Sequence, residues 1–268
     1  MKKIILITIS LCFFLNVNAQ RKKSQQYDLK SSQLSGLKFR SVGPAFMSGR
    51  IADIAINPEN ENEWYVAVGS GGVWKTSNSG TTWTPIADDQ PFYSTGSITI
   101  DPHNSSKIWL GTGENVGGRH VGIGHGVYMS ENGGKKWKDM GLKASEHISK
   151  IIVSPNDPNL VFVASQGPLW SPGGDRGLFR STNGGEDWEN VLSVNEWTGV
   201  TDIVIDHNNP STLYAATWQR HRNVAAYMGG GPGTSIYKSV DNGKTWIEIK
   251  NGLPDSNLGK IGLAISPF

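Results

Sequence analysis

Short runs of apolar, mostly β-branched residues recur along the chain, and each run ends at a turn signal. The first run of each group lies at 51–58, 98–102, 151–155, 203–207 and 261–267. Runs of this length, bounded by Pro, Asn, Asp or Gly, are typical of β-strands. A second strand follows in each complete group, at 64–68, 108–112, 160–164 and 213–217. After residue 37 no apolar stripe has the spacing of an amphipathic helix, so the pattern predicts an all-β chain.

A third strand in each group leads into a repeated turn, at 72–76, 126–130, 177–181 and 235–239. The four turns, called the box turns here, share one frame: a hydroxyl residue, then Asn or Asp at +2, Gly at +4 and Trp at +7. The frame residues after the hydroxyl are Asn78, Gly80, Trp83, Asn132, Gly134, Trp137, Asn183, Gly185, Trp188, Asp241, Gly243 and Trp246. The tryptophans recur about every 50 to 60 residues, which indicates an internal repeat.

The residue types of the frame predict a tight hairpin. The Asn or Asp side chain accepts hydrogen bonds from backbone amides just ahead of it, and the glycine adopts a positive φ. The tryptophan begins the returning strand and covers the turn from its apolar side. The alternative is a calcium site. Because each frame has one Asn or Asp and no second carboxylate, it would bind calcium poorly, and we expect a structural role and no metal.

Four short antiparallel strands in a repeat of about 50 residues are the unit of a β-propeller blade. Residues 37–268 therefore predict a partial propeller of four blades and the first strand of a fifth. Because a blade buries its faces only against neighbouring blades, we expect the chain to be the N-terminal portion of a longer protein. Residues 37–44 are a candidate for the outer strand that closes the ring.

The N-terminal residues predict export. Two lysines precede an apolar run at 4–15, and small residues follow it up to Ala19. This pattern is typical of a secretory signal peptide over residues 1–19, cleaved after Ala19. Residues 20–36 are polar and predict a linker. We therefore expect a secreted, periplasmic or cell-surface protein that has no membrane span once the signal is removed.

Charge and cysteine content exclude several classes of function. Without residues 1–19 the acidic and basic residues are equal in number, so no excess charge attracts nucleic acid. The only cysteine, Cys12, lies within the signal, which excludes disulfides and thiol catalysis in the rest of the chain. No cofactor is expected.

At the box turns the sequence resembles the BNR/Asp-box superfamily, which includes sialidases, xyloglucanases, photosystem assembly factors and the propeller of sortilin-type receptors. Over about residues 45–268, the order of strand, Asn-, Asp- or Ser-Pro turn, strand, Gly-aromatic-basic run and box turn most resembles the sortilin N-terminal (Vps10-type) domain and its bacterial relatives. The resemblance implies a β-propeller. It implies no single function, because one fold hosts many activities.

Two enzyme classes of the superfamily imply particular site residues. Xyloglucanase-like relatives carry a carboxylate just before a Gly-Gly-aromatic-basic run. The run is present here at 71–75, but Gly69 and Ser70 precede it, so the expected acid is absent. Sialidases need an arginine triad, an acid and a Tyr/Glu pair. Arg50, with Asp53 nearby, resembles the first of their motifs, and the other groups cannot be placed.

The loops between second and third strands predict a binding face. They lie at 69–71, 113–126, 166–176 and 218–234 and differ widely in length, whereas the box turns at the opposite ends of the strands are uniform. Insertions on one face usually mark the binding face of a repeat protein. The candidate ligand-binding residues in these loops are Glu114, Arg119, His120, Trp170, Asp175, Arg176, Trp218, Arg220, Arg222 and Tyr227.

These candidates also have interpretations that involve no ligand. His120 and His125 form a conceivable metal pair without an evident third ligand, and solvated loop histidines fit as well. Trp170 and Trp218 can instead pin their loops to the blades, and the Arg-His-Arg run at 220–222 also fits a solvated turn. A glycosidase pair would require carboxylates from adjacent loops, Glu114 and Asp175, to meet. We therefore assign no catalytic residue.

These features lead us to expect a non-catalytic exported propeller that binds a protein, peptide or glycan on its variable loops, as in sortilin. The alternative is a glycoside hydrolase that acts on extracellular polysaccharide, similar to xyloglucanases or sialidases. A third possibility is a scaffold within a larger secreted assembly. The missing acid at Gly69 favours the first hypothesis over the second.

Overall fold

The computed structural model describes residues 30, 32, 36, 49–254 and 256–266. The predicted signal peptide, most of the predicted linker, the candidate closing strand at 37–44 and the last two residues lie outside the described residues. The chain divides into two compact units, Met1–Met47 and Ser48–Phe268. In the first unit the three described residues are exposed. All of the strands belong to the second unit.

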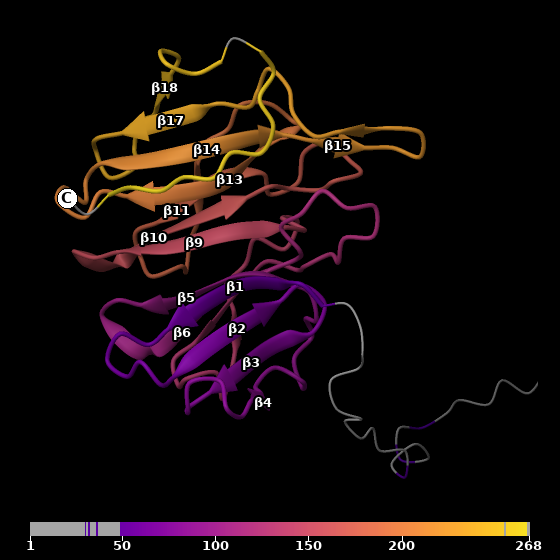
Figure 1. Ribbon diagram of the computed structural model, residues 1–268, viewed down its shortest axis with the longest axis vertical. Coiled ribbons are helices and arrows are strands. Elements are labelled where there is room, and N and C mark those ends of the chain that lie inside the picture. Colours follow the sequence, from indigo (N-terminus) through magenta and orange to yellow (C-terminus); the bar gives the residue numbers. More distant parts are fainter. Residues whose placement is uncertain (1–29, 31, 33–35, 37–48, 255, 267–268) are drawn as a thin grey trace, which may run out of the picture. The chain divides into compact units, whose positions relative to one another are not determined.

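Four antiparallel sheets of four strands follow one another in chain order, and we call them blades one to four (Figure 1). Their strands are β1 (Ile51–Ile56), β2 (Trp64–Val68), β3 (Gly72–Thr76) and β4 (Thr84–Pro85); β5 (Thr95–Asp101), β6 (Asn104–Thr112), β7 (Val127–Ser130) and β8 (Lys138–Asp139); β9 (Ile148–Ser154), β10 (Asp157–Ser165), β11 (Gly177–Ser181) and β12 (Glu189–Leu192); β13 (Thr198–Ile205), β14 (Leu213–Gln219), β17 (Ile236–Ser239) and β18 (Ile247–Ile249). A separate hairpin, β15 (His221–Arg222) and β16 (Tyr227–Met228), lies between β14 and β17. The described residues contain no α-helix, which confirms the prediction of an all-β chain of four-stranded blades.

Three details differ from the sequence-based expectation. The fourth strand of each blade begins one residue after the box tryptophan, because the backbone amides before the tryptophan are bonded within the box turn. The hairpin β15–β16 was not expected. The segment 261–267 forms no strand in its described part, 261–266, which pairs with no described strand. It lies beside β13, where the Leu263 amide donates to Asp202 Oδ2 at 2.8 Å.

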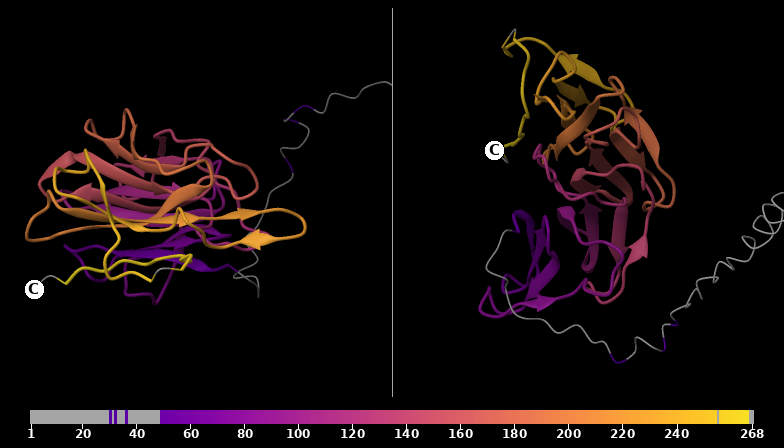
Figure 2. Two further views of the ribbon diagram at one scale, coloured as in Figure 1. Left: turned by 90° about the horizontal axis from the view of Figure 1, so that it is seen from above. Right: turned by 90° about the vertical axis from the view of Figure 1, so that its right-hand side faces the viewer.

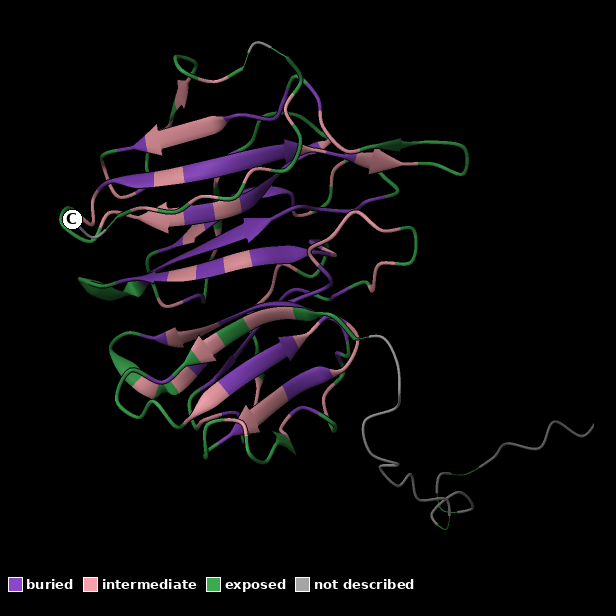
Figure 3. Ribbon diagram, viewed as in Figure 1, coloured by how far each residue is buried: buried purple, intermediate pink, exposed green. Residues whose placement is uncertain are grey.

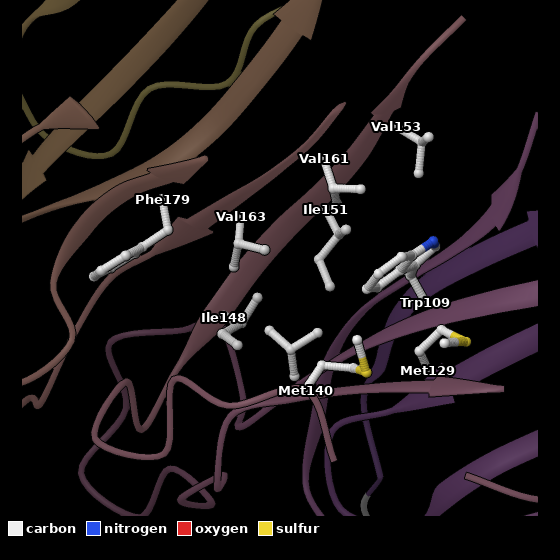
Figure 4. Packing of buried hydrophobic residues seen from close by; sticks show 10 residues of the cluster. Trp109, Met129, Met140, Ile148, Ile151, Val153, Val161, Val163 and Phe179 are labelled. Atoms are coloured by element: carbon white, nitrogen blue, oxygen red, sulfur yellow. The ribbon is translucent and has the colours of Figure 1, made fainter. Parts of the chain in front are cut away.

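The hydrophobic cores lie between neighbouring blades (Figure 3). Between blades two and three, Trp109 and Met129 meet Ile151, Val161 and Phe179 (Figure 4). Separate clusters join blade one to two and blade three to four. Each blade therefore buries apolar surface mainly against its neighbours, as a repeat architecture requires.

One position on the inner strands shows this dependence directly. Ile98, Ile151 and Ile203 lie on β5, β9 and β13, each facing the preceding blade, and they are 3%, 0% and 0% exposed. Ile54 holds the same place on β1, where no described sheet covers it, and is 52% exposed. The sequence position is equally apolar in all four blades, so burial depends on the presence of a preceding blade.

Side chains on β1, β5 and β13 accept backbone amides of the segment that follows each of these blades. Ile98 N donates to Asp53 Oδ2 (3.0 Å) and Ile151 N to Ser97 Oγ (3.2 Å), which ties blade one to two and blade two to three, and Leu263 N donates to Asp202 Oδ2 (2.8 Å) of blade four. Asp53, three residues after the sialidase-like arginine, therefore has a structural role in this chain. Hydrogen bonds to ionised carboxylates are stronger than neutral ones.

The box turns form the predicted hairpins, and the hydroxyl residue has a central part in them. In blade three, Ser181 Oγ accepts the Gly185 amide at 2.8 Å and donates to Asn183 Oδ1 at 2.8 Å. Asn183 Oδ1 also accepts the Asp187 amide at 3.0 Å. The other three turns repeat these bonds at 2.7–3.0 Å. All partners lie within four residues of each other, so each turn closes itself.

The box glycines are required both by backbone conformation and by packing. Their φ angles lie between +71° and +88°, a region that residues with a Cβ disfavour. A Cβ at Gly134 would lie 2.4 Å from Ile86 of blade one, and one at Gly185 would lie 2.8 Å from Trp109 of blade two. At Gly80 the nearest neighbour would be 3.5 Å away. The turns of the later blades therefore pack directly on the preceding blade.

Candidate functional site

The box turns and the variable loops lie at opposite ends of the strands, because consecutive strands in each blade are antiparallel. The loop face is defined here as the connections 69–71, 113–126, 166–176 and 220–235 within the blades, together with 86–94, 140–147, 193–197 and 250–260 after their fourth strands. The first three connections have the predicted bounds, and the fourth begins later because β14 extends to Gln219. From these connections the hairpin β15–β16 projects beyond the sheets (Figure 2).

Exposed apolar side chains gather on the loop face. Among the described residues, thirteen large hydrophobic side chains are exposed, and seven of them belong to the loop face: Tyr93, Ile123, Trp170, Val194, Val224, Tyr227 and Met228. Three of the seven are aromatic and offer flat surfaces for ligand contact. The loop face therefore has the composition expected of a binding surface.

Glu114 begins the long loop of blade two and reaches across to blade one. Its side chain is 3% exposed. Oε1 accepts a hydrogen bond from Arg50 Nη2 at 2.6 Å and lies 3.5 Å from Ser70 Oγ. Oε2 accepts the Gly122 amide at 2.7 Å, within the same loop. Both carboxylate oxygens are thus held in fixed directions at the junction of two blades.

The space beside Gly69 is filled by this carboxylate. A Cβ at Gly69 would lie 2.6 Å from Glu114 Oε1 and 3.1 Å from its Cγ, so a side chain at 69 and the present position of Glu114 exclude each other. The resemblance to xyloglucanases leads us to expect an acid just before residues 71–75. The structure has a carboxylate next to that position, supplied by a different blade.

Glu114 and Asp175 share no hydrogen-bond partner. Asp175 Oδ2 accepts the Ala144 amide at 2.8 Å, in the connection before blade three, whereas Glu114 contacts blade one. The other predicted residues of the long blade-two loop, Arg119 and His120, are exposed. Among the described residues no group of three His, Cys, Asp or Glu side chains is placed to hold a metal ion.

Arg176 is buried and organises the long loop of blade three. Its guanidinium donates to the carbonyl oxygens of Gln166 (2.7 Å), Ser171 (3.1 Å) and Gly173 (3.2 Å), all in that loop. These bonds replace the strand ladder that an irregular segment lacks. By contrast, Trp170 in the same loop is 44% exposed.

Blade four brings its predicted residues together at the base of the hairpin β15–β16. The Trp218 ring is 5% exposed and lies 5.2 Å from the guanidinium of Arg220. The Arg222 guanidinium lies 4.5 Å from the Tyr227 ring, which is 39% exposed. Arg220 is fully buried, and burial lowers its pKa, with the charge of Arg176 adding to the effect.

His147 was not singled out from the sequence, and it is the last residue of the loop-face connection 140–147. The residue is fully buried, and neither ring nitrogen has a hydrogen-bond partner among the described residues. Burial lowers the pKa of His147 to about 3, and the nearby charge of Arg220 contributes to the shift. The imidazole is therefore neutral near pH 7.

Sequence reasoning also missed the partners of the predicted residues. Arg50 is 64 positions from Glu114, and Lys260 donates to the Asn115 carbonyl from 145 positions away. No local pattern connects residues so far apart. The only available signal for Arg50 was its resemblance to a sialidase arginine, and its partner here is a carboxylate of this chain.

With the fold and the loop face established, the family follows from comparison with known proteins. The family model described as "Sortilin, neurotensin receptor 3" (Sortilin-Vps10) matches residues 125–260, half of the chain. The chain therefore belongs to the Sortilin-Vps10 family, as the resemblance at the box turns implied.

Curated relatives and solved structures add a second comparison. The chain is 26% identical over 236 residues to a xyloglucanase of Hypocrea jecorina, covering 76% of this chain and 26% of the relative. It is 23% identical over 248 residues to xyloglucanase Xgh74A of Acetivibrio thermocellus, covering 84% of this chain and 28% of the relative. The chain thus spans about a quarter of the length of these relatives. An ancestral GH74 enzyme has the same fold (TM-score 0.59, 20% identity, 76% of this chain and 26% of that one), and so does Niastella koreensis GH74 (TM-score 0.55, 22% identity, 74% and 30%).

These comparisons correct the functional prediction. Relatives at 21–26% identity are named xyloglucanases, which contradicts the prediction of a non-catalytic binding propeller and favours its alternative, a glycoside hydrolase. The acid is absent at Gly69, as the sequence shows, but these relatives outweigh its absence. Within the described part of the chain, no helix is both long and apolar enough to cross a membrane.

Proposed function

We propose that the natural protein containing this chain is a glycoside hydrolase that acts on xyloglucan or a related extracellular β-glucan, with the loop face as its substrate face. The observation that carries the proposal is the similarity to named xyloglucanases across about three quarters of the chain. Because one fold hosts many activities, the proposal also needs a site, and the loop face offers one.

Glu114 is the carboxylate that this chain contributes to the site. Glycoside hydrolysis uses two carboxyl groups, one as acid and one as base or nucleophile. Glu114 lies beside Gly69, where the xyloglucanase resemblance implies an acid, and its partner Arg50 has a side chain that is 57% exposed. The Arg50 guanidinium donates to Oε1 at 2.6 Å and so fixes the direction of the carboxylate. The second carboxyl group is not assigned to a residue of this chain, which spans about a quarter of its relatives.

Exposed aromatic side chains on the loop face would supply surface for a sugar chain. Tyr93 and Tyr227 belong to connections of blades one and four, and Trp170 belongs to blade three. All three are exposed. Ligand sites typically combine such apolar rings with a few polar groups that fix orientation, and here Arg119 and His120 are exposed on the intervening loop.

Hydrolysis assays on the natural full-length protein test the proposal. We expect reducing ends to be released from xyloglucan and not from sialylated glycans. Glu114→Gln keeps the size of the side chain and one acceptor oxygen but removes its charge, and we expect kcat to fall by about 10² to 10⁴-fold.

The control is Glu63→Gln, which removes another ion-paired carboxylate, bound to Lys75 at 2.7 Å. Glu63 lies at the opposite end of blade one, and its replacement is expected to leave kcat unchanged. A Glu114→Gln variant with full activity would refute the assignment, and a wild-type protein that hydrolyses none of a panel of β-glucans would refute the function.

Export and continuation of the chain form part of the same proposal. An enzyme for extracellular polysaccharide requires export, which the sequence pattern of residues 1–19 supports. We propose that the mature protein begins at Gln20 and that further blades complete the ring. N-terminal sequencing of the protein from its natural host is expected to give Gln20 as the first residue, and a start at Met1 would contradict export by cleavage.

A further inference from the structure

Three consecutive carbonyl oxygens in the loop of blade two each receive a positively charged side chain from far along the chain. Lys260 Nζ donates to Asn115 O at 2.7 Å, Arg220 Nη1 to Val116 O at 2.9 Å and Arg222 Nη2 to Gly117 O at 3.2 Å. The donors are 104 to 145 positions away in sequence. We call these three side chains the cation clamp.

No carboxylate competes with the carbonyl oxygens for the clamp residues. None of the three forms an ion pair with a carboxylate within the described part of the chain. Hydrogen bonds from charged donors are about twice as strong as neutral ones. Arg220 is fully buried, and a buried charge without a carboxylate is costly unless it is hydrogen-bonded. Its Nη1 and Nη2 groups meet this requirement by donating to Val116 O and to Gly167 O (3.1 Å), whereas its Nε has no partner among the described residues.

Packing of the hairpin β15–β16 on the same loop reinforces the clamp. A Cβ at Gly117 would lie 1.8 Å from the Tyr227 hydroxyl, so only glycine permits this approach. Tyr227 in turn packs against the guanidinium of Arg222. Trp218 lies between two clamp residues, 5.2 Å from Arg220 and 5.6 Å from Lys260.

Glu114 immediately precedes the clamped carbonyls. On its other side, the Gly113 amide donates to Ser94 O at 2.8 Å, and the Asn115 side chain donates to Gly96 O at 2.9 Å. The backbone around Glu114 is therefore tied to blade four through the clamp, while its carboxylate is tied to blade one through Arg50. Displacement of the clamped segment must change the direction of the Glu114 side chain.

We propose that Arg220, Arg222 and Lys260 are positioning residues that set the place of the Glu114 carboxylate for catalysis, so that the blade-four connections 220–235 and 250–260 control a group carried by blade two. The role in catalysis rests on the proposed function. The existence of the clamp rests only on the contacts given above. Misplacement of a catalytic group by about 1 Å can cost about 100-fold in rate.

Arg222→Ala in the natural full-length protein is the main test, because Arg222 is half-buried and its loss does not leave a large cavity in the core. The Gly122 amide, which donates to Glu114 Oε2, reports the place of the carboxylate through its hydrogen-exchange rate. We expect exchange at residues 114–122 to rise about 10-fold or more, kcat on xyloglucan to fall about 10 to 100-fold, and KM to change less than about two-fold. Arg222→Lys is expected to restore part of both, and Lys260→Met to act in the same direction more weakly.

The matched control is Arg180→Ala. Arg180 Nε also donates to a carbonyl of the next blade, Asn242 O at 3.0 Å, but at the box turns. Its loss is expected to leave both exchange at 114–122 and kcat unchanged. Unchanged exchange in Arg222→Ala and Lys260→Met would overturn the clamp whatever the activity, and raised exchange with unchanged kcat would overturn its positioning role. Raised exchange in a protein whose wild type hydrolyses no glucan would refute the proposed function and retain the clamp.

Discussion

The box turns and the loop face belong to the same four blades, but they are held by bonds of very different reach. In a box turn the hydroxyl, the Asn or Asp and the glycine bond to partners within four residues. On the loop face, bonds from Arg50 to Glu114, from Arg220 to Val116 and from Lys260 to Asn115 connect residues 64 to 145 positions apart. The hydrogen bonds that close a box turn are therefore local, although the later turns also pack on the preceding blade. The hydrogen bonds of the loop face depend on the assembly of several blades.

The difference explains why function can diverge on one face while the fold is kept. A box turn closed by its own hydrogen bonds can be repeated in every blade with little change. A loop whose backbone is held by side chains from another blade changes its conformation together with that blade. Insertions on the loop face can therefore create a site without altering the box turns, as in other repeat folds.

The largest expected effect tests how far the box turns depend on the preceding blade. Gly80 and Gly134 have the same φ of +85°, but only Gly134 lies against another blade, at Ile86. We expect Gly80→Ala to lower the free energy of unfolding by about 1 kcal/mol through backbone strain. Gly134→Ala should cost about 3 kcal/mol, because overpacking adds to the strain. Urea denaturation measures the free energy of unfolding of both variants. Equal decreases would show that the contact with Ile86 contributes nothing to stability.

A second prediction concerns pH and the loop face. The pKa of His147 is lowered to about 3 in the folded protein, against about 6.5 in the unfolded chain. The unfolded state therefore binds the extra proton below pH 6.5, and stability that is complete above this pH is lost as the pH falls. Between pH 6.5 and 5 the free energy of unfolding should fall by about 2 kcal/mol on this account. His147→Gln should remove that part of the slope, and identical slopes for both proteins would contradict it.

A third prediction isolates a single box turn. Ser181→Ala removes the acceptor of the Gly185 amide, which lies in a buried position. Loss of the partner of a buried donor costs about 1 to 3 kcal/mol, and we expect the lower end of this range because the turn is close to solvent. Thermal denaturation measures the loss. Hydrogen exchange at 113–126 should not change, and a change there would contradict the local character of the hydrogen bonds in the turn.

The smallest effect is expected at Asp241, the one carboxylate in the frame. Hydrogen bonds, chiefly from the Thr245 hydroxyl, lower the pKa of Asp241 below its usual range. A lowered pKa contributes stability above about pH 4 that is lost in acid. Asp241→Asn gives blade four the residue of the other three blades, and we expect a slight change at pH 7 with a flatter profile below pH 4. A variant with the wild-type acid profile would contradict this.

The same contrast in reach decides what the sequence could predict. The strands, box turns and loop bounds followed from residues close together, such as Ser181, Asn183 and Gly185. The positions of the variable loops along the chain were predicted, but the contacts among them were not, and their role as a binding face stays a prediction. Glu114 was singled out, but its contact with Gly69 and Arg50 depends on how two blades pack. A search for an acid in the motif before residues 71–75 could not detect a carboxylate that approaches from the next blade.

The most direct test is a crystal structure of the natural full-length protein with a bound xyloglucan oligosaccharide. The account predicts that the sugar chain lies on the loop face, with the Glu114 carboxylate within about 3 Å of the reacting sugar or of the water that attacks it. An oligosaccharide bound elsewhere, with Glu114 still buried against Arg50 and out of reach of the sugar, would contradict it.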